Sequence, residues 1–202
     1  GVTIIYGSAL ALFQDELKKR LAYSTVSQVS YIVLGTAIVG PLATMGGLVH
    51  LVHQGLMKIT LFFGAGNYAE TLGIHRVSEM NGVGRRMPLT TAALTVAALG
   101  MIGVPPTAGF FGKFFVFNAA VQSGLTWLAV VGVLNAIVAL YYYLVVIKVM
   151  YVDRGQNEDV PIPVGSSHAW ALAFTTLGVI FLGVIAAPLY NWALTGARAL
   201  LF

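Results

Sequence analysis

The stretch LTTAALTVAALGMIGVPPTAGFFGKFFVFNAAV, residues 89–121, decides the fold of this chain. A helix needs about 20 largely apolar residues to cross about 30 Å of hydrocarbon, so this stretch is too long for a single straight span. Pro105 and Pro106, between Gly103 and Gly109, interrupt a helix because each lacks an N–H and clashes with the preceding turn. Carbonyls freed at this depth need protein or a wet cavity around them. The stretch predicts one discontinuous transmembrane helix, broken over residues 103–109, at a pathway or a buried site; a simple proline kink is the alternative.

The whole chain has the composition of a polytopic membrane protein. Of its 202 residues, 58% are hydrophobic and 9% are charged, and the mean hydropathy is +0.85. These values exclude an ordinary soluble domain and predict an all-α bundle of about six membrane helices. The predicted helical segments are residues 2–13, 21–38, 45–68, 89–121, 126–151 and 170–189.

The segment 2–13 is too short to span a bilayer, and the chain opens with Gly1 rather than with methionine. We therefore expect the later part of a longer polypeptide. Residues 1–152 are predicted to form a five-helix bundle whose first helix is clipped. Residues 153–202 are predicted to form a loop and a final transmembrane helix.

The absence of cysteine removes disulfides, thiolate catalysis and iron–sulfur ligation from this chain. We expect no catalytic redox residue, cofactor site or metal site within it. The sequence leaves open whether the chain is a subunit of an enzyme complex. The net charge of +4 and the pI near 9.4 come from short loops, which favours contact with the lipid bilayer over nucleic acid.

The distribution of basic residues predicts the orientation in the membrane. Alternating spans place the loops at residues 18–20, 67–88 and 153–167 on one side, and Arg198 alone on the other. The positive-inside rule makes the first side cytoplasmic, in the inner membrane of a prokaryote. Loops 67–88 and 153–167 are either a docking surface for a peripheral partner or simply solvated.

A polar stripe runs along segment 45–68. His50, Gln54 and Lys58 recur every four residues, within about 80° of one helical face, and His53 lies about 60° to the other side of His50. Because a lysine near mid-bilayer costs about 2.5 to 3.5 kcal/mol even on gentle scales, the stripe should face the bundle interior. Histidine titrates near neutral pH, so we interpret the stripe as a proton path. Hydrogen bonding between neighbouring helices is the alternative.

Lys113 lies about one turn beyond the predicted break, between Phe110-Phe111 and Phe114-Phe115. In this apolar setting its charge should respond to hydration and to charges brought near it. We interpret Lys113 as a gate. The alternative is a lysine that snorkels to the interface.

Three strings together resemble a known family. They are ELKKRLAYSTVSQ (residues 16–28), HLVHQGLMK (50–58) and GVPPTAGFFGK (103–113). Their order and spacing resemble the antiporter-like proton-translocating subunits of complex I-type NADH:quinone oxidoreductases, membrane-bound hydrogenases and Mrp-type cation/proton antiporters.

The resemblance implies two inverted five-helix repeats, of which this chain matches the second plus one final helix. Lys18 and Lys58 match central-axis lysines, His50 a relay histidine and Lys113 the lysine of the broken helix. Gln54 stands where the family usually has a second histidine, with His53 one place earlier. The first repeat is outside these residues, either as an N-terminal half or as a separate chain.

The sequence thus predicts a proton-translocating subunit of a hetero-oligomeric respiratory complex. Protons would move along a Lys, His and water axis, coupled to redox chemistry in other membrane subunits that hold flavin, iron–sulfur clusters and quinone. One alternative is a subunit of a multisubunit Na⁺/H⁺ antiporter, although carboxylates, the usual sodium ligands, are missing from the spans. A second alternative is a structural scaffold with a degenerate path.

Overall fold

The computed structural model describes residues 1–155 and 160–201, and in these it is all-helical. The helices are α1 (Val2–Phe13), α2 (Leu17–Ala37), α3 (Pro41–Leu72), η1 (Val77–Glu79), α4 (Val83–Arg86), α5 (Pro88–Ile102), α6 (Ala108–Gln122), α7 (Thr126–Tyr151), α8 (Ser166–Val184) and α9 (Ala187–Leu201). The predicted fold class is confirmed.

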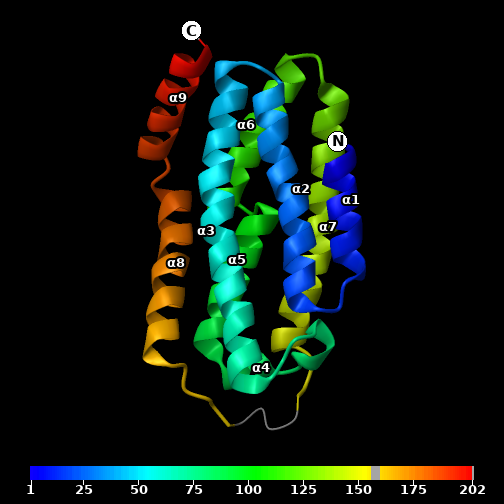
Figure 1. Ribbon diagram of the computed structural model, residues 1–202, viewed down its shortest axis with the longest axis vertical. Coiled ribbons are helices and arrows are strands. Elements are labelled where there is room, and N and C mark those ends of the chain that lie inside the picture. Colours follow the sequence, from blue (N-terminus) through cyan, green and yellow to red (C-terminus); the bar gives the residue numbers. More distant parts are fainter. Residues whose placement is uncertain (156–159, 202) are drawn as a thin grey trace.

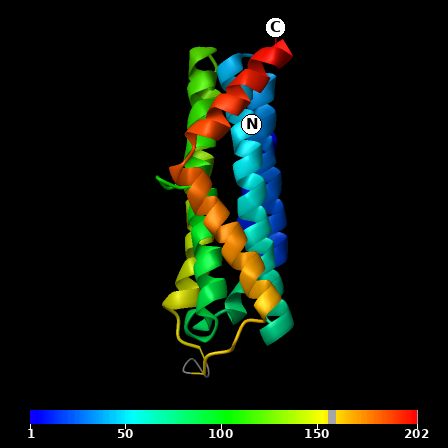
Figure 2. The same ribbon diagram turned by 90° about the vertical axis from the view of Figure 1, so that its left-hand side faces the viewer.

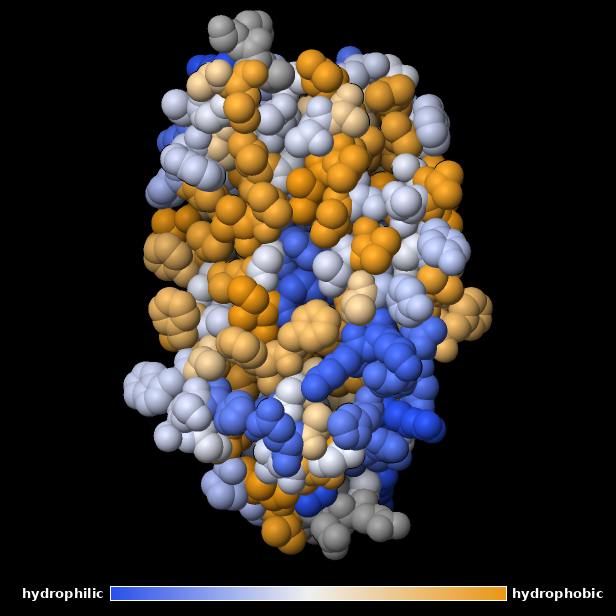
Figure 3. Space-filling model, in the orientation of Figure 1, coloured by the Kyte–Doolittle hydropathy of each residue, from blue (hydrophilic) through white to orange (hydrophobic). Residues whose placement is uncertain are grey.

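The long helices run side by side along one axis (Figure 1). Helix α3 is central and packs against α2, α5, α6, α8 and α9, whereas α1 packs on α2 and α7. Within the described residues, α3, α7 and α8 are each long and apolar enough to cross a membrane. Hydrophobic side chains dominate the upper part of the face in Figure 3, and hydrophilic ones gather at its lower end.

The break in segment 89–121 is confirmed. Helix α5 ends at Ile102, and α6 begins at Ala108. Gly103 ends α5 with φ of 95°, a left-handed conformation that suits glycine, and its N–H donates to the carbonyl of Leu99 at 3.0 Å. The interruption lies near mid-height of the bundle, in the centre of Figure 1.

The last predicted helix, residues 170–189, differs from the structure because it is itself broken. Helix α8 ends at Val184, and α9 begins at Ala187. Pro188 has no N–H to donate and its ring clashes with the carbonyl four residues earlier, so α8 cannot continue through it. Figure 2 shows both helices running obliquely across the bundle. The predicted division of the chain at residue 152 stays a prediction.

The loop predicted over residues 67–88 is more structured than expected. Helix α3 continues to Leu72, and η1 and α4 follow. The connection is fixed to the turn between α1 and α2, because Leu17 N–H donates to His75 O at 2.9 Å and Val77 N–H donates to Asp15 O at 2.8 Å. The Asp15 carboxylate also accepts bonds from Ser78 N–H and Oγ at 3.1 and 2.7 Å. Residues 156–159 of the predicted loop 153–167 lie outside the described residues.

Candidate functional site

Lys58 lies in the bundle interior, 6% exposed, where α2, α3 and α7 meet. Its Nζ donates to Leu21 O at 2.9 Å, to Ser24 Oγ, and to Tyr143 OH at 3.3 Å. Ser24 Oγ also bonds Leu21 O at 2.7 Å and Tyr143 OH at 3.0 Å. The segment LAYS of α2 thus supplies the acceptors that make a lysine tolerable at this depth.

His50, His53 and Gln54 lie on the same helix and are buried, with exposures of 0%, 0% and 5%. The polar stripe therefore faces inward, as its periodicity predicts. Lys58 is eight residues from His50, a rise of about 12 Å, so direct contact between them is not possible along the helix. Within the described residues, no side chain hydrogen-bonds to the ring nitrogens of either histidine. The backbone of Gln28 faces the His50 ring, and that of Ala108 faces the His53 ring.

Glycine brings α6 close to His50. A Cβ on Gly112 would meet the Cα and Cβ of His50 at 2.9 Å, closer than side chains pack. The position of Gly112, directly before Lys113, is thereby explained. It lets α3 and α6 approach, so that the histidine and the second lysine share one region of the bundle.

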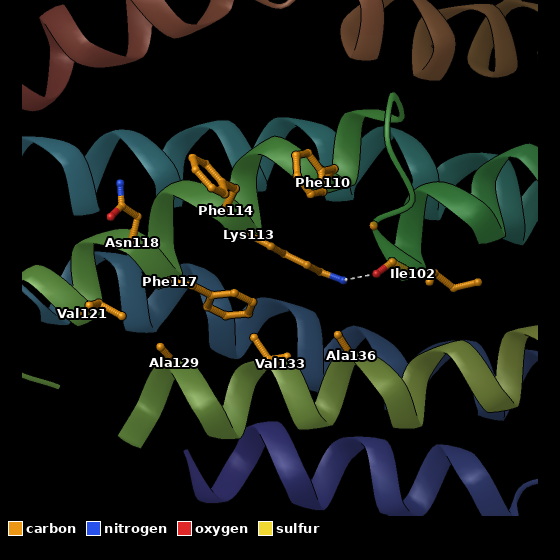
Figure 4. A pocket seen from close by; sticks show the side chains of 11 residues that line it. Ile102, Phe110, Lys113, Phe114, Phe117, Asn118, Val121, Ala129, Val133 and Ala136 are labelled. Atoms are coloured by element: carbon orange, nitrogen blue, oxygen red, sulfur yellow. Dashed lines mark hydrogen bonds between the residues drawn. The ribbon is translucent and has the colours of Figure 1, made fainter. Parts of the chain in front are cut away.

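Lys113 replaces the backbone donors that the two prolines remove. In an unbroken helix, residues 105 and 106 would donate N–H groups to the carbonyls of Met101 and Ile102, but proline has none. Lys113 Nζ donates to Met101 O at 2.6 Å and to Ile102 O at 3.2 Å instead. Figure 4 shows the side chain reaching back to the end of α5. The ammonium also faces the negative end of the α5 dipole, which stabilises its charge.

A cavity of about 500 Å³ lies between α6 and α7 beside Lys113 (Figure 4). Lys113, at 5% exposed, is one of its few polar walls. Phe114, Val121 and Val133 at its rim are exposed on the surface of the bundle. The remaining lining residues are Ile102, Gly103, Phe110, Phe117, Asn118, Ala129 and Ala136.

The sequence analysis missed a polar cluster on α2 and α7. Tyr31 is fully buried, and its ring lies edge-on to His50, with centroids 5.9 Å apart. Asn135 Nδ2 donates to Tyr31 OH at 2.8 Å and to Ser27 Oγ at 3.0 Å. The three- and four-residue spacing of Ser24, Ser27 and Tyr31 in an apolar segment was the available signal.

Lys18 is not part of this interior. It is exposed in the first turn of α2, and its predicted place on the central axis stays a prediction. Arg20, two residues later, is 7% exposed and donates to Gln14 O at 2.8 Å and to Tyr142 O at 3.1 Å. The buried cation at this end of α2 is therefore Arg20, which the sequence analysis placed with Lys18 in a basic loop.

The break between α5 and α6 is covered by the other broken helix. A Cβ on Gly183 of α8 would meet Pro106 O at 2.5 Å and Ala108 N at 2.8 Å. Helix α8 thus covers the inner end of the break, at Pro106 O and Ala108 N, while Val104, Pro105 and Pro106 are exposed at the surface of the bundle. Beyond the second break, the ring of Tyr190 on α9 lies 6.4 Å from that of His53.

The site is suited to proton exchange. Across residues 1–155 and 160–201, no three His, Cys, Asp or Glu side chains come together to hold a metal ion. What converges is amine, imidazole, hydroxyl and carbonyl groups, borne by α2, α3, α6 and α7. Such groups pass protons through water without a change of oxidation state.

Comparison with known proteins gives consistent matches. A family model described as "NADH:quinone oxidoreductase/Mrp antiporter, TM" matches residues 1–139. The chain is 33% identical over 210 residues to F(420)H(2) dehydrogenase subunit N of Methanosarcina mazei, covering 98% of this chain and 42% of that protein. It is 35% identical over 196 residues to NADH-quinone oxidoreductase subunit N of Bdellovibrio bacteriovorus, covering 94% and 40%.

A solved structure has the same fold. A chain of the membrane-bound sulfane sulfur reductase, an archaeal respiratory membrane complex, superposes with a TM-score of 0.91 at 27% identity, covering 99% of this chain and 40% of the other. The chain described here therefore spans about two-fifths of the length of the proteins it matches.

Proposed function

Because the chain belongs to the NADH:quinone oxidoreductase/Mrp antiporter transmembrane family, we propose that it translocates protons as an antiporter-like subunit of a membrane respiratory complex. The observation that carries this proposal is the pair of buried lysines, Lys58 and Lys113. Neither ammonium has a carboxylate partner among the contacts described above, so its proton is held only by neutral oxygens. A group of this kind can gain or lose a proton without breaking an ion pair.

In the proposed path, protons pass between Lys58, His50 and Lys113 through bound water. Lys58 exchanges with the hydroxyls of Ser24 and Tyr143, to which it is already bonded. His50 offers a buried imidazole, and His53 and Gln54 widen the polar region around it. Because screening is weak in this interior, a proton gained by one lysine disfavours the charge on the next. This repulsion orders the transfers.

The energy for translocation is proposed to come from partner subunits. The names of the two relatives describe a dehydrogenase and a quinone oxidoreductase, and the sulfane sulfur reductase is a respiratory complex. We infer that flavin, iron–sulfur clusters and quinone are held by such partners, and that a charge change there shifts the proton affinity of the lysines. A first repeat, in an N-terminal half or a separate chain, would supply the rest of the path.

The proposed orientation places the lower end of Figure 1 in the cytoplasm of a prokaryote. The start of α2, η1, α4 and the end of α7 meet there, and they carry most of the basic residues. Arg198 lies near the opposite end, on α9. The positive-inside rule supports this choice.

A test is donor-driven proton uptake by the whole complex in proteoliposomes. Lys58→Met and Lys113→Met should each abolish uptake while the complex still assembles, because methionine is unbranched and only one atom shorter than lysine but carries no ionisable proton. Lys148→Met is the matched control, since Lys148 forms an exposed ion pair with Asp153 at 2.7 Å. Unchanged uptake in both interior variants would sink the proposal.

A sodium/proton antiporter subunit is the second candidate. The family name includes Mrp antiporters, but sodium prefers hard oxygen ligands of the carboxylate type. The sequence contains seven acidic residues, and of those described none lines the path from Lys58 to Lys113. Growth of a deletion strain in high sodium at alkaline pH separates the two functions, because only loss of an antiporter should abolish it.

A further inference from the structure

Tyr31 lies between two groups of the proposed path. The centroids of its ring and the His50 imidazole are 5.9 Å apart in an edge-on arrangement, and Lys113 Nζ lies over the ring, 5.6 Å from its centroid. The second distance is within the roughly 6 Å over which a cation is attracted to an aromatic face. The ring thus contacts both groups between which the proposed path passes a proton.

The hydroxyl of Tyr31 is fixed by α7. It accepts a hydrogen bond from Asn135 Nδ2 at 2.8 Å and donates to Gly132 O at 3.2 Å. Asn135 is 4% exposed, and its second N–H is bound by Ser27 Oγ at 3.0 Å. Ser27 Oγ in turn donates to Ile4 O of α1 at 2.9 Å. Three helices therefore hold one phenol in one position.

The phenol of Tyr31 does not carry the proton itself in this arrangement. Its hydroxyl proton is donated to Gly132 O, and the face of a phenol does not relay protons. A proton that moves between His50 and Lys113 therefore has to travel through water, beside the apolar ring that contacts both groups.

We propose that Tyr31 is a positioning residue that closes the step between His50 and Lys113, and that Asn135 holds it closed. The step opens when the ring tilts away from Asn135 and water joins the two groups. The inference rests on the proposed function, since a gate needs a path. Its role is to prevent protons from flowing back when partner subunits do not drive transfer.

Passive proton flux tests this role without an electron donor. The whole complex is reconstituted in proteoliposomes, a potassium diffusion potential is imposed with valinomycin, and inward proton flux is measured. Tyr31→Ala removes the barrier and should raise the flux. Tyr31→Phe and Asn135→Leu keep the packing volume and remove the anchor. They should raise the flux about fivefold, the shift that one typical net hydrogen bond supports.

Matched controls and a combined variant decide the outcome. Tyr141→Phe, on the exposed face of α7, and Asn191→Leu, exposed on α9, should leave the flux unchanged. Adding Lys113→Met to Tyr31→Ala should abolish the leak, because the leaking protons pass Lys113. A leak that survives Lys113→Met comes from a damaged bundle and overturns the proposal, as does no rise in any Tyr31 or Asn135 variant. Loss of donor-driven uptake in Lys58→Met with an unchanged leak in Tyr31→Phe and Asn135→Leu would reject the gate and keep the proposed function.

Discussion

Lys58 and Lys113 are buried to the same extent, at 6% and 5% exposed, yet they are held by different kinds of group. Lys58 is bonded to two hydroxyls and one carbonyl, and those hydroxyls are also bonded to each other. Lys113 is bonded only to the carbonyls at the end of α5. The comparison shows that Lys58 joins a hydrogen-bond network whose other members also bond to each other. Lys113 instead supplies the hydrogen-bond donors that the carbonyls at the end of a broken helix lack.

The largest expected difference is in stability after loss of each lysine. In Lys113→Met, the carbonyls of Met101 and Ile102 lose their donor, and a buried unsatisfied group costs about 1–3 kcal/mol. In Lys58→Met, Ser24 still bonds Leu21 O and Tyr143 OH, so the cost should stay below about 1 kcal/mol. Protease sensitivity of this chain during heating of the detergent-solubilised complex measures both. Equal losses would show that the two sites are alike.

Gly103→Ala should act on the Lys113 side alone. At φ of 95° a Cβ is strained by about 1–2 kcal/mol, although its nearest neighbour, Lys113 Cδ, is 3.5 Å away. We expect lower thermal stability and slower proton uptake. Gly66→Ala in α3 is the control, because its Cβ would meet nothing within 4 Å and alanine favours a helix. A stability loss in the control as large as that in Gly103→Ala would contradict the strain argument.

Tyr143→Phe should act on the Lys58 side alone and more weakly. It removes the longest of the three bonds, at 3.3 Å, and leaves Leu21 O and Ser24 Oγ in place. A net hydrogen bond of about 1 kcal/mol corresponds to a roughly fivefold slower donor-driven uptake if the hydroxyl takes part in transfer. Tyr141→Phe, exposed on the same helix, should leave the rate unchanged. An unaltered rate in Tyr143→Phe would confine the transfer to Ser24.

The smallest expected effect concerns the N-terminal end of α2, because the first two turns of this helix carry the acceptors of Lys58. Hydrogen bonds from Ser78 hold the pKa of Asp15 below its ordinary value of 3.8. The carboxylate therefore stabilises the folded state above that value, and this contribution is lost as the pH falls through the lowered pKa. Ser78→Ala should destabilise by less than about 1 kcal/mol, because the pair is exposed to water. The difference in thermal stability between Ser78→Ala and the parent chain should disappear at acid pH, where Asp15 is protonated in both.

Charge and proline made part of the site predictable from sequence. Lysine is costly in an apolar segment, and consecutive prolines end a helix wherever they occur, so Lys58, Lys113 and the break were marked without knowledge of their neighbours. Tyr31 and Asn135 could not be predicted as partners, because helical periodicity does not say which face of α2 meets which face of α7. Lys18 and Arg20 are both basic and lie two residues apart. Which of them is buried depends on the face that the first turn of α2 presents to the bundle, and in the structure it is Arg20.

The second break was missed for a local reason. Pro188 lies one residue from the predicted end of segment 170–189, where a proline is ordinarily read as a terminus. In the structure a new helix begins at Ala187, with Pro188 in its first turn, and runs for 15 residues to Leu201. The hydropathy of the segment does not distinguish a single membrane helix that ends at the proline from two consecutive helices joined near it.

The contact of Gly183 with Pro106 and Ala108 has a consequence for the surrounding lipid. Helix α8 lies against the carbonyl of Pro106, close to its own end at Val184. Acyl chains beside α8 consequently meet the apolar side chains of this helix before they meet that carbonyl. A side chain larger than glycine at this one position would wedge the helices apart and admit the bilayer to both.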